Sequence, residues 1–296
     1  MRVEQEEKQK LEAETRRKIE EEQRIAAEEA RRKEEERLRA EEEAKQKAAA
    51  GGIEMVDIPG GSFQMGDTTG TGGGDEKPVH TVNIKPFRMS KYEVTIAQYR
   101  WFAAATGRAA GGDCWVDASG QWQQKNDANW QNPYFNQSDN HPVVCVNWND
   151  AVAFAQWLST QTGQRYRLSS EAEWEYACRS GGRQEKYCGG NKPVALAWYD
   201  NDSGGKTHPV GQKSANGLGL YDMSGNVWEW TQDCWNESYN GAPADGSAWQ
   251  TDYCGRRVRR GGSWGSKPGG LRSALRFGSP AADYLNTLGF RLVQDK

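Results

Sequence analysis

The sequence predicts an α+β domain with few regular elements, preceded by a long charged helix. Residues 1–50 are almost wholly Glu, Lys, Arg, Gln and Ala, whereas all 13 Trp, all 10 Pro and all 6 Cys follow Ala50. Helix signals recur up to about Cys178, and the remainder is rich in Gly, Asn, Trp and Ser. We therefore divide the chain into a charged segment, residues 1–50, and a globular domain, residues 51–296.

The charged segment has few apolar residues besides alanine. After the extreme N-terminus they are only Leu11, Ile19, Ile25 and Leu38, too sparse for a sustained coiled-coil seam. Alternating acidic and basic clusters supply i,i+4 ion pairs, and Ala favours helix, so we expect an extended solvated helix that acts as a semi-rigid spacer. A charged disordered tail is one alternative. Weak dimeric or trimeric association is another, since Leu11 and Ile25 share a heptad register.

The globular domain opens with two runs of strand-like alternation. Residues 53–66 alternate apolar and polar side chains on both sides of Pro59-Gly60. This pattern is typical of a strand, a turn and a second strand, so we expect a hairpin.

Three helices with recognisable ends follow. Thr95 and Gln98 have capping-box spacing, and Gly107 is a stop signal for the first helix. The second helix is expected to start at Asn149-Asp150 and to end at Gly163. A short third helix starts at the Ser170-x-x-Glu173 box.

Charge and hydropathy exclude some partners. A net charge of -3 supplies no basic surface for nucleic acid, so we expect no nucleic-acid partner. The sequence has no run of eighteen apolar residues, and no hydrophobic core follows Met1. The chain as given is therefore expected to carry neither a membrane span nor a secretion signal.

The six cysteines favour disulfides. They form an even set, without a C-x-x-C pair or histidines at zinc-ligand spacing. Fifteen pairings are possible, and buried free thiols in a cytosolic protein are an alternative. Local loops suggest two pairs and leave a third by elimination: Cys178 with Cys188, Cys234 with Cys254, and Cys114 with Cys145. Disulfides predict an oxidising, extracytoplasmic compartment.

The last forty residues contain a motif frame with an unusual filling. Residues 260–264, Arg-Gly-Gly-Ser-Trp, open the frame, and residues 289–291, Gly-Phe-Arg, close it. The residues between them have neither helical nor strand periodicity and mix small residues with isolated Leu, Phe and Tyr. We expect a loop here, and we expect the protein to act through it.

Several ordered motifs resemble the formylglycine-generating-enzyme, or sulfatase-modifying factor, family. They are residues 92–95 (YEVT), 167–176 (RLSSEAEWEY), 219–223 (GLYDM), 225–230 (GNVWEW) and the terminal frame. The resemblance runs from about Gly52 to the end. It implies a C-type-lectin-like fold of the formylglycine-generating-enzyme type, with sparse irregular secondary structure.

The family's oxidase uses two cysteines just after the Gly-Gly-Ser-aromatic motif. Soft thiolates of this kind bind Cu(I) and react with oxygen. The matching positions here are Ser266 and Leu271, and no cysteine follows Cys254. The resemblance therefore implies that this chain is not an enzyme and has no catalytic cofactor. A non-catalytic pseudoenzyme or a residual oxidase is the alternative.

A structural calcium site is also implied by the resemblance. It maps onto the side chains of Asp222 and Glu229 and the carbonyls of Gly225 and Val227, oxygen donors that suit calcium. Alternatively, Asp222 caps a turn and Glu229 pairs with an arginine.

The terminal frame further resembles the variable proteins of diversity-generating retroelements, most closely the treponemal type. In them an error-prone reverse transcriptase substitutes at template adenines near the C-terminus. The resemblance implies a variable region at residues 264–288, in which residues 271–274 and Arg276 are fixed scaffold. The residues expected to bind ligand are Trp264, Gly265, Ser266, Gly269, Gly270, Leu275, Phe277, Gly278, Ser279, Ala281, Ala282, Tyr284, Leu285 and Thr287.

The apolar residues of this region predict a binding surface. Leu275, Phe277, Tyr284 and Leu285 lie in a Gly-broken segment, and large side chains among small ones are typical of binding sites. Alternatively, they fill the core. The resemblance implies a cell-surface protein that binds an unknown protein or other macromolecule. It meets the membrane only through the lipid anchor of a precursor, which this chain lacks.

Overall fold

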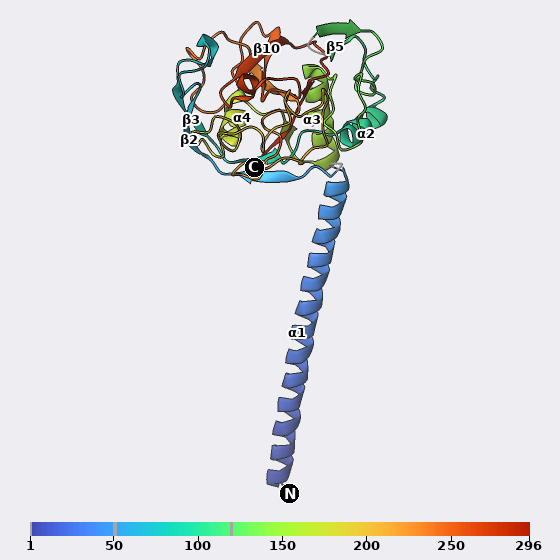
Figure 1. Ribbon diagram of the computed structural model, residues 1–296. Coiled ribbons are helices and arrows are strands. Elements are labelled where there is room, and N and C mark those ends of the chain that lie inside the picture. Colours follow the sequence, from blue (N-terminus) through green and yellow to red (C-terminus); the bar gives the residue numbers. More distant parts are fainter. Residues whose placement is uncertain (1, 50–51, 119–120) are drawn as a thin grey trace. The chain divides into compact units, whose positions relative to one another are not determined.

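The N-terminal segment is one continuous helix. The computed structural model describes residues 2–49, 52–118 and 121–296, and the chain divides into the units Met1–Ala49 and Ala50–Lys296. Helix α1 (Arg2–Ala49) confirms the predicted helix (Figure 1). Every side chain from residue 16 to 38 is exposed, and pairs such as Arg16 with Glu20 lie along it. Among the described residues, no helix has the length and apolarity needed to cross a membrane.

One four-stranded antiparallel sheet joins the two ends of the globular domain. Its order is β1-β4-β12-β7. The strands are β1 (Met55–Ile58), β4 (Phe87–Ser90), β12 (Val293–Asp295) and β7 (Tyr166–Arg167). Because β12 pairs with both β4 and β7, the C-terminal strand is part of the scaffold.

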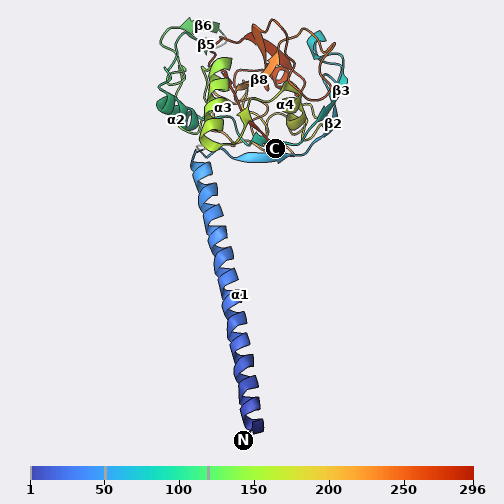
Figure 2. The ribbon, with the colours of Figure 1, turned by 180° about the vertical axis from the view of Figure 1, so that it is seen from behind.

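A second four-stranded sheet carries the terminal region. Its order is β10-β9-β8-β11, and only β11 is parallel to its neighbour. The strands are β8 (Trp228–Cys234), β9 (Arg256–Arg260), β10 (Arg276–Pro280) and β11 (Leu288–Gly289). Figures 1 and 2 both show the strands β5 and β10 at one end of the domain and the C-terminus at the other end.

The expected opening hairpin is wrong in its pairing. The strands β1 and β2 (Gly61–Met65) form as expected, but β1 pairs with β4, and β2 pairs with β3 (His80–Ile84). The chain passes from one sheet to another at Gly60, where a Cβ atom would lie 2.7 Å from the Ile84 carbonyl oxygen. Sequence alternation identified the strands, whereas long-range packing selected their partners.

The helices agree with their local end signals, with one shift. Helix α2 (Ile96–Thr106) has the expected Thr95–Gln98 box and ends at Gly107, which is left-handed with φ 66°. Helix α4 (Glu171–Cys178) starts at the Ser170–Glu173 box as expected. Helix α3 (Trp148–Thr162) begins earlier than predicted, because Asn147, not Asn149, exchanges capping hydrogen bonds with Asp150 at 2.9 and 3.1 Å.

The remaining regular elements are short. Strands β5 (Cys114–Ala118) and β6 (Gln121–Lys125) pair as a ribbon, and two 3-10 turns cover Gly74–Glu76 and Pro268–Leu271.

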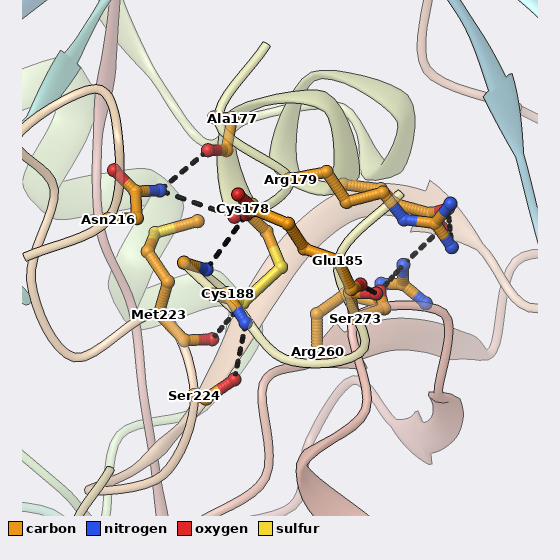
Figure 3. The surroundings of a disulfide bond; sticks show 12 residues. Ala177, Cys178, Arg179, Glu185, Cys188, Asn216, Met223, Ser224, Arg260 and Ser273 are labelled. Carbon is orange, nitrogen blue, oxygen red and sulfur yellow. Dashed lines mark hydrogen bonds and ion pairs between the residues drawn. A yellow bond between two sulfur atoms is a disulfide. The ribbon is translucent and has the colours of Figure 1, made fainter. Parts of the chain in front are cut away.

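Three disulfides staple the loops. They join Cys114 to Cys145, Cys178 to Cys188, and Cys234 to Cys254, which confirms all three expected pairs. Figure 3 shows the second bridge, where the Asn216 amide donates to the carbonyls of Ala177 and Cys178, and the Cys188 amide donates to Ser224. Three disulfides fit a protein that folds in an oxidising, extracytoplasmic compartment.

Candidate ligand-binding site

The opening motif of the terminal frame is a tight buried turn. Gly261 and Gly262 have φ values of 96° and 78°, a conformation that favours glycine. A Cβ atom on Gly262 would lie 2.5 Å from the Gly270 carbonyl oxygen. Next to this turn, the Trp264 indole donates to the Asn286 carbonyl at 3.2 Å and packs on Phe135. The turn therefore fixes where the following residues start.

The residues between the two motifs are not entirely loop, which corrects the prediction. Residues Arg276–Pro280 form β10, antiparallel to β9. The alternation was obscured because its buried members include Arg276 and Gly278, which an apolar pattern does not recognise as inward-facing. A strand inside this region holds its exposed residues in a defined register.

The structure divides the fourteen expected ligand-binding residues into two groups. Nine are exposed or partly exposed, and we call them the terminal surface: Gly265, Ser266, Gly269, Gly270, Leu275, Phe277, Ala281, Ala282 and Tyr284. Five are buried, which corrects the expectation that they face a ligand: Trp264, Gly278, Ser279, Leu285 and Thr287.

Packing explains these five corrections. Leu285 joins the main hydrophobic cluster, and the Thr287 carbonyl accepts the Trp228 amide at 2.8 Å. Gly278 lies under Trp235, since an added Cβ atom would come within 2.5 Å of the indole ring. Ser279 pairs with Arg257 inside the sheet. These residues support the terminal surface from below.

The stretch expected to be fixed scaffold makes scaffold contacts. Leu271 is 0% exposed, and Arg272 binds both carboxylate oxygens of Glu76 at 2.6 Å. The Ser273 hydroxyl donates to the Glu185 carbonyl at 2.6 Å, which attaches the region to the loop closed by the Cys178–Cys188 bridge (Figure 3).

The β5–β6 ribbon flanks the terminal surface and was missed in the sequence. The amide of Trp115 donates to the Tyr284 carbonyl at 2.8 Å, and the Asn286 amide returns a bond to the Trp115 carbonyl at 3.0 Å. Trp115 and Trp122 are 38% and 45% exposed. Exposed tryptophans on a short ribbon were the available signal, and they extend the aromatic surface beyond residues 264–288.

The inner face of β9 carries a buried ionic cluster. Arg260 is fully buried, pairs with Glu175 and donates to the carbonyls of residues 273–275. Arg276 binds the two oxygens of Glu171 at 2.8 and 2.7 Å. Burial by itself would raise the pKa of Glu171, but the Arg276 and Arg260 guanidinium groups hold it below its usual value. This cluster ties the terminal sheet to α4.

The outer face of β9 is aromatic and cationic. Arg257 and Arg259 alternate with the inward residues, as expected for a strand. Arg257 lies over the Trp148 ring at 3.9 Å, and Arg259 lies over Trp228 at 4.8 Å. Sequence reasoning did not select these residues, although the run Arg256–Arg260 in a strand indicates cations on both faces.

The two catalytic cysteine positions of the resemblance hold other residues in unlike settings. The Ser266 hydroxyl accepts the Ser263 amide at 2.9 Å and is partly exposed. Leu271 is buried among Tyr187, Leu196 and Tyr199. All six cysteines of the chain are in disulfides, so none is a free thiolate.

The two carboxylates of the expected calcium site have different surroundings in the structure. Both oxygens of Glu229 face the Arg291 guanidinium at 2.7 to 2.8 Å, and the Trp174 indole donates to the same carboxylate at 2.7 Å. A cation beside a fully engaged carboxylate would meet the arginine's positive charge. Among the described residues, no group of three or more His, Cys, Asp or Glu could hold a metal ion.

The other members of that set lie close to a second buried carboxylate. Asp222 accepts the Gly211 amide at 2.7 Å through Oδ2, and burial raises its pKa to about 6. The Val227 amide donates to Glu93 at 3.2 Å, while Gly225 lies at a close backbone approach to Trp198. The other oxygen of Asp222, Oδ1, is enclosed and has no hydrogen-bond partner among the described residues, so a calcium ion at Asp222 stays a prediction.

Two cavities of the described residues are lined by other residues than those of the terminal surface. One of about 510 Å³ is lined by residues such as Arg165, Glu173 and Asp245, far from residues 264–288 in the chain. A smaller one of about 110 Å³ borders residues 272–274 and Asp67. None of the nine residues of the terminal surface lines either of these two cavities.

Fold, frame and site together define a lectin-like scaffold of the sulfatase-modifying type. The model of the sulfatase-modifying factor enzyme 1-like domain matches residues 40–296, and the chain belongs to this family. It is 32% identical to the formylglycine-generating enzyme of Streptomyces coelicolor, covering 81% of this chain and 89% of that protein. It is 30% identical to the inactive C-alpha-formylglycine-generating enzyme 2 of Bos taurus, over 81% and 87%. The family thus includes enzymes and an inactive member.

Two solved structures share the fold over 82% of this chain and 95% of theirs. PvdO from Pseudomonas aeruginosa is 38% identical with a TM-score of 0.72. Treponema denticola variable protein 1 is 25% identical with a TM-score of 0.66. These likenesses confirm the expected family fold and the resemblance to a variable protein.

Proposed function

We propose that this chain is a non-catalytic, ligand-binding member of the family, displayed at the cell surface through a lipid-anchored precursor. Its terminal surface contacts a protein or other macromolecule, and the residues of that surface vary through a diversity-generating retroelement. Ser266 and Leu271, in place of two cysteines, support the loss of formylglycine chemistry, because hydroxyl and alkyl groups are not ligands for Cu(I). Binding needs no catalytic cofactor.

One observation carries the proposal: exposed residues lie among buried residues across residues 264–288, and the ion pairs of Arg272 and Arg276 attach this stretch to the scaffold. Phe277 is 49% exposed, while its neighbours Arg276 and Gly278 are buried. An added Cβ atom on Gly269 meets nothing within 4 Å, so larger side chains fit there. A surface of this design tolerates replacement without loss of the fold, as a variable binding site requires.

The test compares two exposed aromatic residues. Phe277→Ala removes a ring from the terminal surface, whereas Tyr253→Ala removes a ring that is 91% exposed but lies outside it. Both variants, with wild type, are screened on arrays of purified extracellular proteins and glycans. We expect Phe277→Ala to lose at least about tenfold in affinity for wild-type hits, and Tyr253→Ala to keep it. Equal loss in both variants contradicts the proposal.

The oxidase alternative has its own readout. The protein is incubated with copper, oxygen and a sulfatase-type cysteine peptide, with a formylglycine-generating enzyme as the positive control. We expect no aldehyde by mass spectrometry. Aldehyde formation above the protein-free control would overturn the non-catalytic part of the proposal.

A further inference from the structure

Arg259 lies in a slot between two aromatic rings at the edge of the terminal surface. It pairs with Phe277 across β9 and β10, and its guanidinium carbon is 4.7 Å from the centre of the Phe277 ring. The Trp228 ring is 4.8 Å from the same carbon, and the two rings are 6.4 Å apart. Both distances are within the range of cation–π attraction. The rings therefore hold the guanidinium in a fixed place.

The slot supplies no acceptor for this cation. The nitrogens Nε and Nη1 of Arg259 are enclosed and have no hydrogen-bond partner among the described residues. Burial lowers the pKa of Arg259 to about 10, and Asp283 opposes this only as a nearby charge, without an ion pair within 4.0 Å in the described part of the chain. An enclosed cation without an acceptor is strongly unfavourable.

The neighbouring Arg257 has acceptors that Arg259 lacks, although its own Nε has no hydrogen-bond partner among the described residues. It also lies over a ring, that of Trp148, at 3.9 Å. Its Nη1, however, donates to the Gln232 carbonyl at 2.7 Å and to the Gln250 side chain at 3.1 Å. Stacking on an aromatic ring thus does not by itself explain why Arg259 has no acceptor.

The slot opens towards the surface that we propose binds ligand. Phe277 is 49% exposed, and Arg259 and Trp228 are partly exposed. The third nitrogen, Nη2, is not enclosed and makes no hydrogen bond to the described residues. An anionic group from a bound ligand can therefore reach this nitrogen.

We propose that Arg259, Trp228 and Phe277 form a carboxylate-binding site that takes an Asp or Glu side chain of a polypeptide ligand. The inference rests on the proposed ligand-binding function. A planar guanidinium matches a planar carboxylate. The rings provide apolar contact for the methylene groups of an acidic side chain. Asp283 and Arg256 both act on Arg259 as nearby charges, so two cations and one carboxylate leave a single net positive charge, which suits a monoanionic carboxylate better than a phosphate dianion.

The first experiment uses sodium acetate as the probe on the full chain. The NMR signal of the Arg259 Nε–H group is followed at constant ionic strength, and phosphate and sulfate are run as separate arms. We expect a saturable shift with acetate that survives in Arg257→Gln, and we expect the acetate-dependent shift of the neighbouring Trp228 indole N–H signal, followed in parallel, to be lost in Arg259→Gln. Asp283→Asn should tighten acetate binding about twofold or more, because it removes a competing negative charge. No saturable shift, or tighter binding of phosphate or sulfate, would overturn the site.

The second experiment uses peptides. Array hits that contain Asp or Glu are compared with their Asn or Gln counterparts. We expect the acid-to-amide change to weaken binding about tenfold or more in wild type and to have no effect in Arg259→Gln. Hits among sialylated glycans that lose binding with Arg259→Gln, without any peptide hit, would overturn the choice of a polypeptide ligand.

The two proposals fail separately. Acetate binding at Arg259 without any macromolecular hit keeps the carboxylate site and removes the ligand-binding function. A hit that binds wild type and Arg259→Gln equally, but is lost in Phe277→Ala, keeps the function and removes the carboxylate site.

Discussion

Arg259 and Arg260 are neighbours on β9 and face opposite sides of one sheet, yet their surroundings share little. Arg260 is 0% exposed, pairs with Glu175 and donates to three carbonyls. Arg259 lies between two rings with no acceptor. Buried charges normally have partners, so the carboxylate and the three carbonyls around Arg260 mark it as scaffold, although its Nε has no hydrogen-bond partner among the described residues. The incomplete set around Arg259 marks a group whose partner comes from outside.

The same division separates two glycines of the terminal region. Gly278 lies in β10 beneath Trp235, where no side chain fits without displacement. Gly269, in the turn Pro268–Leu271, is exposed, and an added Cβ atom meets nothing. Residues that look alike in the sequence therefore have opposite tolerance to change.

The sharpest way to break the arginine comparison is to remove each charge. Arg260→Leu leaves the Glu175 carboxylate buried without this partner and leaves carbonyls of residues 273–275 without a donor. We expect a loss of about 3–5 kcal/mol in the free energy of unfolding. Arg259→Leu should change that free energy by less than about 1 kcal/mol, or raise it. Denaturant titration of both variants measures the free energy of unfolding. Equal losses in the two variants would contradict the distinction between Arg259 and Arg260.

The stability of the buried ionic cluster should also depend on pH. Burial, with the nearby Glu171 charge, raises the pKa of Asp233 to about 7 from its ordinary value of 3.8. Between pH 4 and 7 the folded chain therefore keeps a proton that the unfolded chain releases, so stability falls as pH rises. One such proton lowers the free energy of unfolding by at most about 1.4 kcal/mol per pH unit.

The check is the slope of stability against pH. Asp233→Asn should remove about 1 kcal/mol per pH unit from the decline between pH 4 and 7, while Asp252→Asn, at an exposed position, serves as the control. The pKa of Glu171 is lowered from its ordinary value of 4.5. Glu171 therefore changes the slope of stability against pH with the opposite sign, and only at pH values below about 4.5. Parallel slopes for wild type and Asp233→Asn would show that Asp233 is ionised in the folded chain.

The glycine comparison carries the smallest expected effect. Gly278→Val should cost about 1–3 kcal/mol in unfolding free energy, because Trp235 must move. Gly269→Val should stay within about 0.5 kcal/mol of wild type. Thermal melts of the two variants measure the difference, and a large loss for Gly269→Val would show that the turn is less tolerant than its open surroundings indicate.

Local signals in the sequence were good guides where the interaction is local. The Thr95–Gln98 and Ser170–Glu173 boxes join residues three apart, and both helices start there. The Cys178–Cys188 pair closes a loop with a separation of 10 residues. The start of α3 was predicted at Asn149, but Asn147 caps the helix. This error is also local, since the two asparagines lie two residues apart next to the helix start.

Long-range features escaped prediction. Strand β10 was missed because its inward residues are an arginine and a glycine, and the burial of Arg276 depends on Glu171, 105 residues away. Five expected surface residues proved buried, and one of them, Leu285, belongs to the hydrophobic cluster to which α2 and α3 contribute. The flanking ribbon with Trp115 was missed because its pairing with residues 284–286 crosses most of the domain.

The sequence by itself determined the helix ends, the candidate disulfides, the family scaffold and the absence of cysteine at positions 266 and 271. These depend on interactions between near neighbours or on the identity of single residues. Only the tertiary structure decided which face each residue of β9 presents, which terminal residues reach solvent, and which arginine has a partner. The physical reason is that burial and the pairing of charges depend on groups that distant segments bring together, and Arg259 differs from Arg260 only in what those segments place around it.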